Sequence, residues 1–233
     1  MKEFKITELF TSIEGEGIRS GELAFFVRFF GCNLDCAYCD TGYSREAEIA
    51  ASPAAPRNDN MPTANRQPPF TLMTLEEITA AVKKSGCVNV TVTGGEPLIQ
   101  ENIAELLAAI AGQGCKINVE TNGSINIKSV PCLSGLFFTC DYKSPSSGMS
   151  GKMFLTNISA LTENDVLKFV VSNKNDLLAA LEILNKYPPK CYTYLSPVYG
   201  TIAPAEIVRF MKEHKLVERV RVQLQLHKYI GVR

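Results

Sequence analysis

Short apolar runs recur along the chain, and amphipathic stretches separate several of them. The runs are rich in β-branched and aromatic residues, which is typical of buried strands. They predict strands over 24–30, 88–93, 117–121, 136–141, 166–171, 192–196 and 219–226. The run over 24–30 (AFFVRFF) is interrupted only by Arg28.

The amphipathic stretches carry apolar residues three and four positions apart, as one face of a helix requires. They predict helices over 74–84, 97–112, 175–187 and 204–215. The first opens on a capping box formed by Thr74 and Glu77. The second has Pro97 at its first position, where a missing backbone N–H costs nothing.

Alternating strands and helices predict an α/β fold, with a parallel sheet covered by helices. A complete eight-stranded barrel takes about 250 residues, whereas the chain has 233 residues and too few strands of this kind. We therefore predict an incomplete, open parallel (β/α) barrel that forms a single domain over 1–233.

One segment departs from this pattern. Residues 44–70 hold five of the twelve prolines and no Leu or Val. Such a segment cannot bury much apolar surface. It is predicted to be a surface loop or insertion.

Composition narrows the class of protein. Lys+Arg and Asp+Glu both number 24, so the formal net charge is zero, which gives no support for nucleic-acid binding. No apolar run approaches the roughly 18 residues of a membrane span. The N-terminus alternates polar and apolar residues and lacks the apolar core of a signal peptide. These features predict a cytoplasmic protein, in which cysteines more often serve as ligands or packing groups than in disulfides.

Three of the eight cysteines lie close together, directly after the predicted strand over 24–30. They are Cys32, Cys36 and Cys39. Scattered buried thiols rarely have this spacing. A structural zinc site needs four ligands, and the histidines, His214 and His227, lie far along the chain. A 4Fe–4S cluster with three thiolates is the better interpretation, because its fourth iron stays open for chemistry.

Two further motifs follow predicted strands. Thr93–Pro97 (TGGEP) has two glycines that permit a close backbone approach, and a carboxylate, Glu96, that can pair with an ammonium group. Glu120 opens the sequence ETNG at the end of the next strand. Ligand sites of parallel α/β folds lie at such strand ends.

The Cys-x3-Cys-x2-Cys spacing, with Tyr38 before the last cysteine, resembles the signature of radical S-adenosylmethionine (SAM) enzymes. With SIEGEG over 12–17, Arg28, CDT over 39–41, TGGEP, ETNG and HKYIG over 227–231, the chain resembles the 7-carboxy-7-deazaguanine synthase family. The resemblance implies a 4Fe–4S cluster held by the three cysteines, SAM as cofactor, and Mg²⁺.

The resemblance also implies the reaction of a carbon–nitrogen lyase. 6-Carboxy-5,6,7,8-tetrahydropterin would become 7-carboxy-7-deazaguanine with loss of ammonia, in the biosynthesis of 7-deazapurines such as queuosine. The radical comes from the cofactor, so no side chain is expected to act as a general acid or base. The implied partners are the small pterin, a reducing flavodoxin or ferredoxin-type electron donor, and a second copy of the chain in a homodimer.

Site residues carry over from the family motifs. The implied SAM-binding residues are Tyr38, Gly94, Gly95, Glu96, Glu120, Ser144, Pro145, Ser146, Ser196 and Pro197. The implied substrate-binding residues are Ile13, Glu14, Gly15, Glu16, Arg28, Thr93, His227 and Arg233, the last through its α-carboxylate. Thr41 would bind Mg²⁺, with Asp40 in support, because hydroxyl and carboxylate oxygens suit this cation.

Several alternatives stay open. A glycyl-radical-enzyme activase uses a similar cluster, but would lack the SIEGEG and HKYIG elements. A noncatalytic metal-binding module could use the three thiolates as a structural site. Arg28 could serve a structural salt bridge instead of binding substrate. The other cysteines, which have no ligand spacing, are expected to pack in the interior: Cys87, Cys115, Cys132, Cys140 and Cys191.

Overall fold

The computed structural model describes residues 2–42, 70–218 and 220–232. The predicted insertion over 44–70 lies, apart from Phe70, outside the described residues. Within them, nine strands form one sheet in the order β3-β1-β2-β4-β5-β6-β7-β8-β9. The strands are β1 (Glu3–Ile13), β2 (Leu23–Phe29), β3 (Thr71–Thr74), β4 (Asn89–Gly94), β5 (Lys116–Thr121), β6 (Leu136–Lys143), β7 (Val166–Val171), β8 (Tyr192–Pro197) and β9 (Val220–Val222).

The sheet is parallel from β2 to β9, and β1 pairs antiparallel with both β2 and β3. The outermost strands, β3 and β9, do not pair with each other in the described sheet, so the barrel stays open. The prediction of an α/β fold with an incomplete parallel barrel is therefore confirmed.

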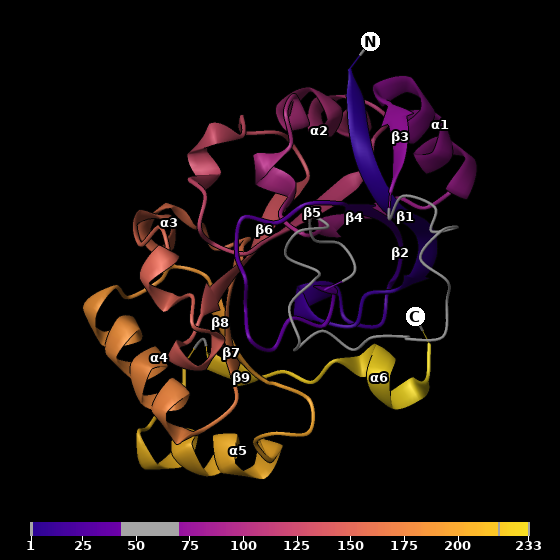
Figure 1. The fold of residues 1–233 in the computed structure, drawn as a ribbon. Helices are drawn as coiled ribbons and strands as arrows, with labels where there is room; N and C mark the ends of the chain where they lie inside the picture. The colour runs from indigo at the N-terminus through magenta and orange to yellow at the C-terminus, as the bar shows by residue number, and fades with distance from the viewer. Residues whose placement is uncertain (1, 43–69, 219, 233) are drawn as a thin grey trace, which may run out of the picture.

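Helices lie along the outer side of the curved sheet, as Figure 1 shows for α1, α2, α4 and α5. No described helix is both long enough and apolar enough to span a membrane. The helices are α1 (Leu75–Ser85), α2 (Ile103–Ala111), α3 (Thr156–Ala160), α4 (Lys174–Lys186), α5 (Pro204–Glu213) and α6 (Leu226–Ile230).

The two faces of the parallel strands differ in polarity. Alternate residues of β4 and β5, such as Val92 and Val119, belong to the core shared with the helices. The residues between them, such as Thr93 and Glu120, line the interior cavity. Because strand side chains alternate between faces, the outer face holds the core and the inner face is free for chemistry.

Two predicted elements differ from the structure. The helix predicted over 97–112 is divided into a 3-10 helix, Pro97–Ile99, and α2. Asn102 adopts a left-handed conformation (φ 63°) between them, which breaks the helical path. The strand predicted over 219–226 shortens to β9, because the chain then turns away and Leu226 begins α6. Arg219 lies outside the described residues.

The N-terminal strands β1 and β3 were not predicted. Alternation of polar and apolar residues is present in β1, whose Phe4 and Ile6 are buried. The strand β3 has four residues, and none of them is buried. Such a short strand carries too little pattern to be recognised from the sequence.

Candidate active site

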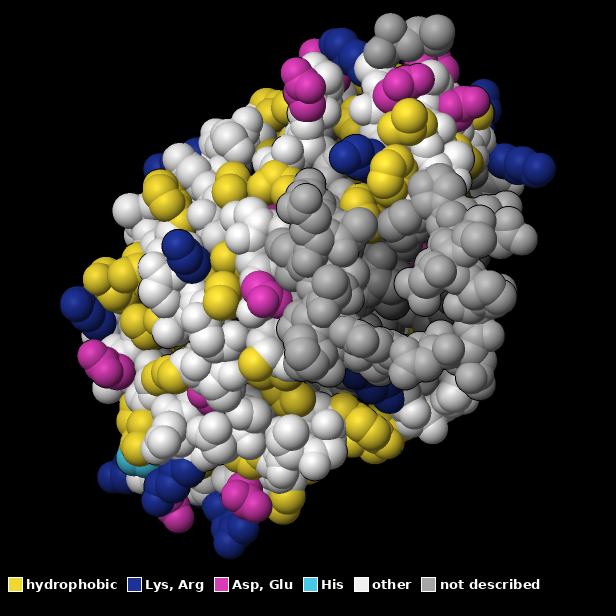
Figure 2. Space-filling model, in the orientation of Figure 1, with side chains coloured by type: hydrophobic (Ala, Val, Ile, Leu, Met, Phe, Trp, Pro, Cys, Tyr) yellow, Lys and Arg dark blue, Asp and Glu magenta, His cyan; other side chains and the backbone are white. Residues whose placement is uncertain are grey.

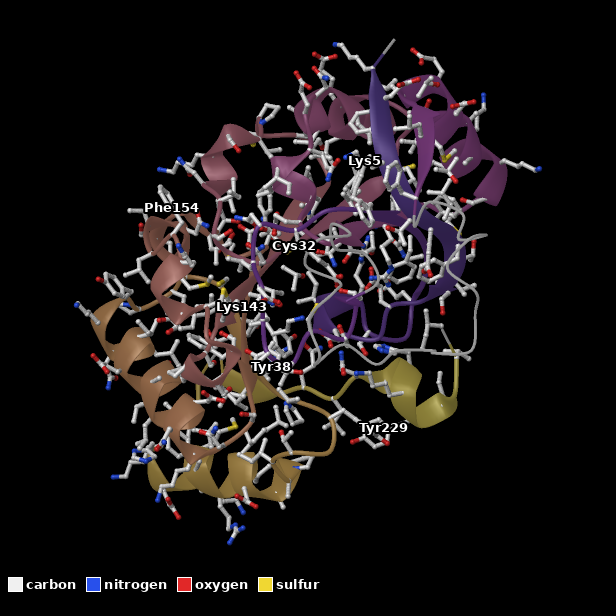
Figure 3. All side chains as sticks on the ribbon, viewed as in Figure 1. Lys5, Cys32, Tyr38, Lys143, Phe154 and Tyr229 are labelled. Carbon is white, nitrogen blue, oxygen red and sulfur yellow. The ribbon has the colours of Figure 1, made fainter. Side chains whose placement is uncertain are left out.

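The carboxyl ends of the parallel strands surround a cavity of about 520 Å³. Its walls come from the β1–β2 loop, the cysteine loop after β2, the inner face of β4 to β8, and α6. In Figure 3, Tyr38 and Lys143 lie close together inside the curve of the sheet, with Cys32 nearby. The cavity thus gathers residues from almost the whole length of the described chain.

The three cysteines of the spaced motif line this cavity together, and none of them forms a disulfide. Asn122, at the end of β5, donates from Nδ2 to the Cys32 sulfur at 3.6 Å. Burial raises the pKa of the Cys32 thiol, so a bound cation would be needed to hold the thiolate. The structure thus places the three cysteines in one loop at the cavity, and their role as cluster ligands stays a prediction.

The thiols do not form a closed site for one ion. Among the described residues, no three His, Cys, Asp or Glu side chains converge on a point that a single metal ion could occupy. A structural zinc site requires such convergence. An iron–sulfur cluster does not, because each thiolate binds a different iron atom. The arrangement fits the cluster better than the zinc alternative.

Glycines allow the end of β4 to rest directly on the cysteine loop. A Cβ atom at Gly95 would lie 1.9 Å from the Gly31 carbonyl oxygen, and one at Gly94 would lie 2.3 Å from that of Phe29. The Gly95 N–H donates to Phe29 O at 3.0 Å. Both glycines also line the cavity. The sequence analysis predicted that these glycines permit a close backbone approach, and the structure shows that they approach the chain that leads into the cysteine loop.

Glu96 is fully buried and does not line the cavity. Its carboxylate accepts hydrogen bonds from the backbone N–H groups of Leu98 and Asn122 and from the Thr121 hydroxyl, at 2.6–2.9 Å. Burial raises its pKa to about 7, although these hydrogen bonds oppose the shift. The side chain ties the end of β4 to the end of β5.

Four charged side chains form a chain of alternating sign across the cavity floor. Lys168 donates to Glu16 Oε2 at 2.5 Å and pairs with Asp141 Oδ1 at 3.1 Å. Asp141 Oδ2 accepts from Lys143 at 2.7 Å. Asp141 and Lys168 are partners in the β6–β7 register, so their side chains share the inner face. Burial would raise the pKa of Asp141, but the two lysines hold it below its usual value.

Glu14 is held by partners inside the protein. Its Oε1 accepts from Arg19 Nη2 at 3.2 Å and from the Thr91 hydroxyl. Burial raises its pKa, and Arg19 and Thr91 oppose that change. The guanidinium of Arg19 also donates to the Lys116 carbonyl at 3.1 Å. Glu14 lines the cavity, and its Oε1 ties the β1–β2 loop to β4 through Thr91.

Arg28 lines the cavity and also forms an ion pair. Its Nε lies 3.4 Å from Glu8 Oε2 on the neighbouring strand. Its guanidinium lies 5.7 Å from the centre of the Phe10 ring, which stacks on Phe26. Thr93 is the register partner of Arg28 on the other side and lines the same wall. Both predicted roles of Arg28, structural pair and cavity group, are compatible with this geometry.

The helix α6 brings His227 against the N-terminal loop. A Cβ atom at Gly15 would lie 1.9 Å from His227 Nδ1, so only glycine permits this contact. The Leu226 N–H donates to Gly15 O at 2.9 Å. Burial lowers the pKa of His227, which favours the neutral imidazole. The structure thus joins two predicted substrate-binding segments, while Arg233 lies outside the described residues.

Asp40 and Thr41 lie at the edge of the cavity beside the cysteine loop. The Thr41 Oγ1 is 3.7 Å from the Cys39 sulfur. Asp40 pairs with Lys228 of α6 at 3.3 Å. Lys228 also lies 5.6 Å from the centre of the Tyr199 ring.

The predicted SAM-binding residues divide into two groups. Tyr38, Glu120, Ser196 and Pro197 line the cavity with Gly94 and Gly95. The segment 144–146 does not line it, because the Ser146 backbone N–H and hydroxyl both donate to buried Asp176 of α4. Lys143, directly before this segment, lines the cavity instead.

Glu120 is a partly buried carboxyl group on the inner face of the sheet. Burial raises its pKa to about 7; Lys168 opposes the shift, while Glu14 and Glu16 add to it. The group is therefore divided between its neutral and charged forms near pH 7. It can donate or accept a hydrogen bond toward the cavity.

The sequence analysis gave no individual role to several polar residues of the site, although two of them lie within its ETNG and HKYIG motifs. They are Arg19, Asn122, Asp141, Lys143, Lys168 and Lys228. All but Arg19 line the cavity. A signal existed in β6 and β7, where single charged residues interrupt apolar runs at positions that share one face. A charged side chain in a buried strand needs a partner or a site.

Comparison with known proteins finds relatives that agree on one family. A model of the radical SAM superfamily matches residues 26–130. The chain is 41% identical to the 7-carboxy-7-deazaguanine synthase of Clostridium acetobutylicum, over 97% of this chain and 96% of that protein. It is 35% identical to the 7-carboxy-7-deazaguanine synthase of Methanospirillum hungatei, over 98% of this chain and 86% of that protein.

A solved structure shares the fold. The crystal structure of QueE from Escherichia coli matches with a TM-score of 0.71 at 22% identity, covering 97% of this chain and 95% of that chain. At this identity, the likeness is evidence for the fold alone. It agrees with the open barrel of parallel strands described above.

Proposed function

The chain belongs to the 7-carboxy-7-deazaguanine synthase family of radical SAM enzymes, and we propose that it converts 6-carboxy-5,6,7,8-tetrahydropterin into 7-carboxy-7-deazaguanine with loss of ammonia. The product leads to 7-deazapurines such as queuosine. One observation carries the proposal: the three motif cysteines share a cavity with Glu16 and His227, which come from opposite ends of the chain. An activase of glycyl-radical enzymes would have no use for these two end segments.

The cofactors fit the residues present. Cys32, Cys36 and Cys39 would hold a 4Fe–4S cluster, with Gly94 and Gly95 beside it. Tyr38, Ser196 and Pro197 offer a wall for the adenosyl group of SAM. When bound, these cofactors supply the deoxyadenosyl radical that removes a hydrogen atom from the substrate. The protein supplies position and electrostatics.

The opposite end of the cavity would hold the pterin. Glu16 offers an acceptor for the N–H groups on the pterin edge, and Ile13, Gly15 and the neutral imidazole of His227 lie beside it. Arg28 offers a planar guanidinium to the substrate carboxylate. Glu14 contributes mainly by holding the loop in place, since its carboxylate binds Arg19.

Mg²⁺ would bind at Thr41, with Asp40 in support. The hydroxyl oxygen of Thr41 lies next to the cysteine loop at the cavity edge, and oxygen donors suit this cation. Asp40 would have to share its carboxylate with Lys228. We expect Mg²⁺ to stimulate turnover and Thr41→Ala to remove most of that stimulation.

The remaining parts of the proposal concern the whole chain. Residues 1–233 would form one radical SAM domain that acts in the cytoplasm as a homodimer. A reducing flavodoxin or ferredoxin-type protein would supply the electron. Figure 2 shows hydrophobic, basic and acidic side chains interspersed on one face, which fits the equal numbers of charges in the sequence.

Anaerobic turnover tests the proposal directly. The reconstituted protein, given reductant, SAM, Mg²⁺ and carboxytetrahydropterin, should release ammonia and carboxydeazaguanine in equal amounts. Cys36→Ala should lose the iron–sulfur absorbance and all turnover. Cys132→Ala should keep both, because Cys132 lies outside the motif and is exposed, whereas the sequence analysis wrongly expected it to pack in the interior. A loaded protein that leaves the pterin unchanged would refute the function. An active Cys36→Ala variant with intact absorbance would refute the ligand assignment.

A further inference from the structure

The chain of charges on the cavity floor contains one lysine that contacts two carboxylates at once. Lys168 comes from the middle of β7, between the core residues Leu167 and Phe169. Its ammonium group lies 2.5 Å from Glu16 and 3.1 Å from Asp141. A lysine is rarely placed in a buried strand, so this position calls for an explanation.

The carboxyl groups around Lys168 could not share the cavity without a cation. Glu16, Glu120 and Asp141 all line the cavity, and the charge of Glu16 raises the pKa of Glu120, because neighbouring like charges disfavour each other. Lys143 contacts Asp141 but does not contact Glu16 in the described structure. Within this chain of charges, Lys168 is therefore the lysine that contacts Glu16.

The geometry also fixes where Glu16 points. Glu16 belongs to a loop, and loops are less rigid than strands. Lys168 belongs to a central strand whose neighbours on both sides are paired, and its partner Asp141 is the adjacent residue in the register. A loop carboxylate bonded to such a lysine is held by the rigid sheet rather than by its own loop.

We infer that Lys168 is a positioning residue for substrate binding, which anchors the Glu16 carboxylate to β7 so that its remaining lone pairs face the pterin edge. The inference rests on the proposed function, since it assigns Glu16 to the pterin. It adds a role to a residue that no sequence motif includes. Lys168 thus affects substrate binding through Glu16, and Asp141 affects it through Lys168.

Binding of the pterin tests the inference without turnover. Anaerobic calorimetry measures the Kd of carboxytetrahydropterin for the holoenzyme with an oxidised cluster and SAM present. Lys168→Met should raise this Kd at least tenfold and leave the cluster absorbance unchanged, while Lys168→Arg should recover part of the loss. Lys174→Met, at an exposed lysine of α4, is the matched control and should bind as the parent does.

A double-mutant cycle separates positioning from a general structural effect. In a Glu16→Gln background, Lys168→Met should change the Kd less than threefold, because the anchored carboxylate is already absent. An equal factor in both backgrounds, or an unchanged Kd in Lys168→Met, would overturn the inference. If Lys168→Met does not retain its cluster, the same cycle is run with Lys168→Arg and judged by the same criterion. A parent protein that does not bind the pterin would instead overturn the proposed function, and the inference with it.

Discussion

Individual residues in and around this cavity shape it in two ways, which their close contacts reveal. Gly15 and Gly95 provide absent side chains: each lets another group approach to a distance that a Cβ atom would block. Glu96 and Arg19 provide buried polar groups that tie loops to strands. At both kinds of position, a small substitution should alter the site without removing a ligand contact.

Gly15→Ala should weaken substrate binding. The new methyl group would meet the imidazole of His227, which must then move away from the pterin edge. Loss of one such hydrogen bond costs about 1–2 kcal/mol, or roughly five- to thirtyfold in Kd. Calorimetry on the loaded protein measures the change. Gly151→Ala, where the Cβ would meet nothing within 4 Å, is the control. Equal Kd values for Gly15→Ala and the parent would show that this contact is dispensable.

Glu96 should make the protein less stable as pH rises. Its pKa is raised from 4.5 to about 7, so the folded protein binds more protons than the unfolded chain between these values. The free energy of unfolding therefore falls as pH rises from about 4.5 to 7, by about 3 kcal/mol for this one group. This decrease in the free energy of unfolding is complete above about pH 7 and has not begun below about pH 4.5.

Urea unfolding of Glu96→Gln checks this expectation. The variant cannot ionise, so its fall in stability between pH 5 and pH 8 should be smaller than that of the parent. It should also be less stable than the parent at pH 5, because its amide nitrogen cannot accept the hydrogen bond from Asn122. Glu163→Gln, at an exposed carboxylate, should keep the pH dependence of the parent. The same dependence in Glu96→Gln would contradict the assignment.

Among the secondary-structure elements, the inner strands and most of the long helices could be predicted from the hydrophobic pattern, whereas the helix that completes the cavity wall, α6, could not. Apolar runs identified six strands, β2 and β4 to β8, with each end placed within two residues of its observed position. Periodic apolar positions identified α1, α4 and α5. The helix α6 was missed because none of its five residues is buried. Its position depends on a contact with the loop at Gly15, which no local pattern encodes.

The candidate site followed from sequence only where a motif had a local signature. The cysteine spacing and TGGEP are short and contiguous, so they could be recognised. The pairing of Lys168 with Asp141 depends on the register between β6 and β7, and the sequence does not specify which residues become neighbours across strands. The buried partners of Glu96 could not be read from the sequence either, because Leu98, Thr121 and Asn122 meet its carboxylate only in the folded protein.

The capping box at the start of α1 should contribute measurably to stability. The Thr74 hydroxyl accepts from the Glu77 N–H at 3.2 Å, and the Glu77 carboxylate accepts from the Thr74 N–H at 2.8 Å. Thr74→Ala should lower the free energy of unfolding by about 1 kcal/mol. Thr74→Ser keeps the hydroxyl and should stay close to the parent. Equal losses for both variants in urea unfolding would mean that the methyl group, not the cap, is responsible.

Across the whole molecule, the β1–β2 loop and the last helix of the described chain meet at the cavity. The N-terminal loop and α6 lie together through Gly15 and Leu226, while Lys228 reaches the cysteine loop at Asp40. Tyr229 lies on the outer side of α6 and is 59% exposed (Figure 3). The cavity wall formed by α6 is thus held by a few polar contacts and contributes little to the core.

An extension of the C-terminus should therefore disturb the site but not the fold. A short C-terminal tag is expected to raise the apparent substrate constant, by about ten- to a hundredfold if the terminal carboxylate binds the pterin. The same tag at the N-terminus is the control. Both proteins should show the same cluster spectrum. Equal kinetics for the two proteins would show that the chain end does not touch the substrate.

The opposite polarity of the two sheet faces has a consequence for how such an enzyme can change over generations. Side chains of the outer face pack against the helices, whereas inner-face side chains such as Asp141 and Lys168 line the cavity and pair with charged groups around it. An inner-face residue can therefore be exchanged with little loss of core packing, provided that its charge partner changes with it. New substrate preferences can arise in this barrel through paired exchanges on neighbouring strands, while the scaffold that carries them stays the same.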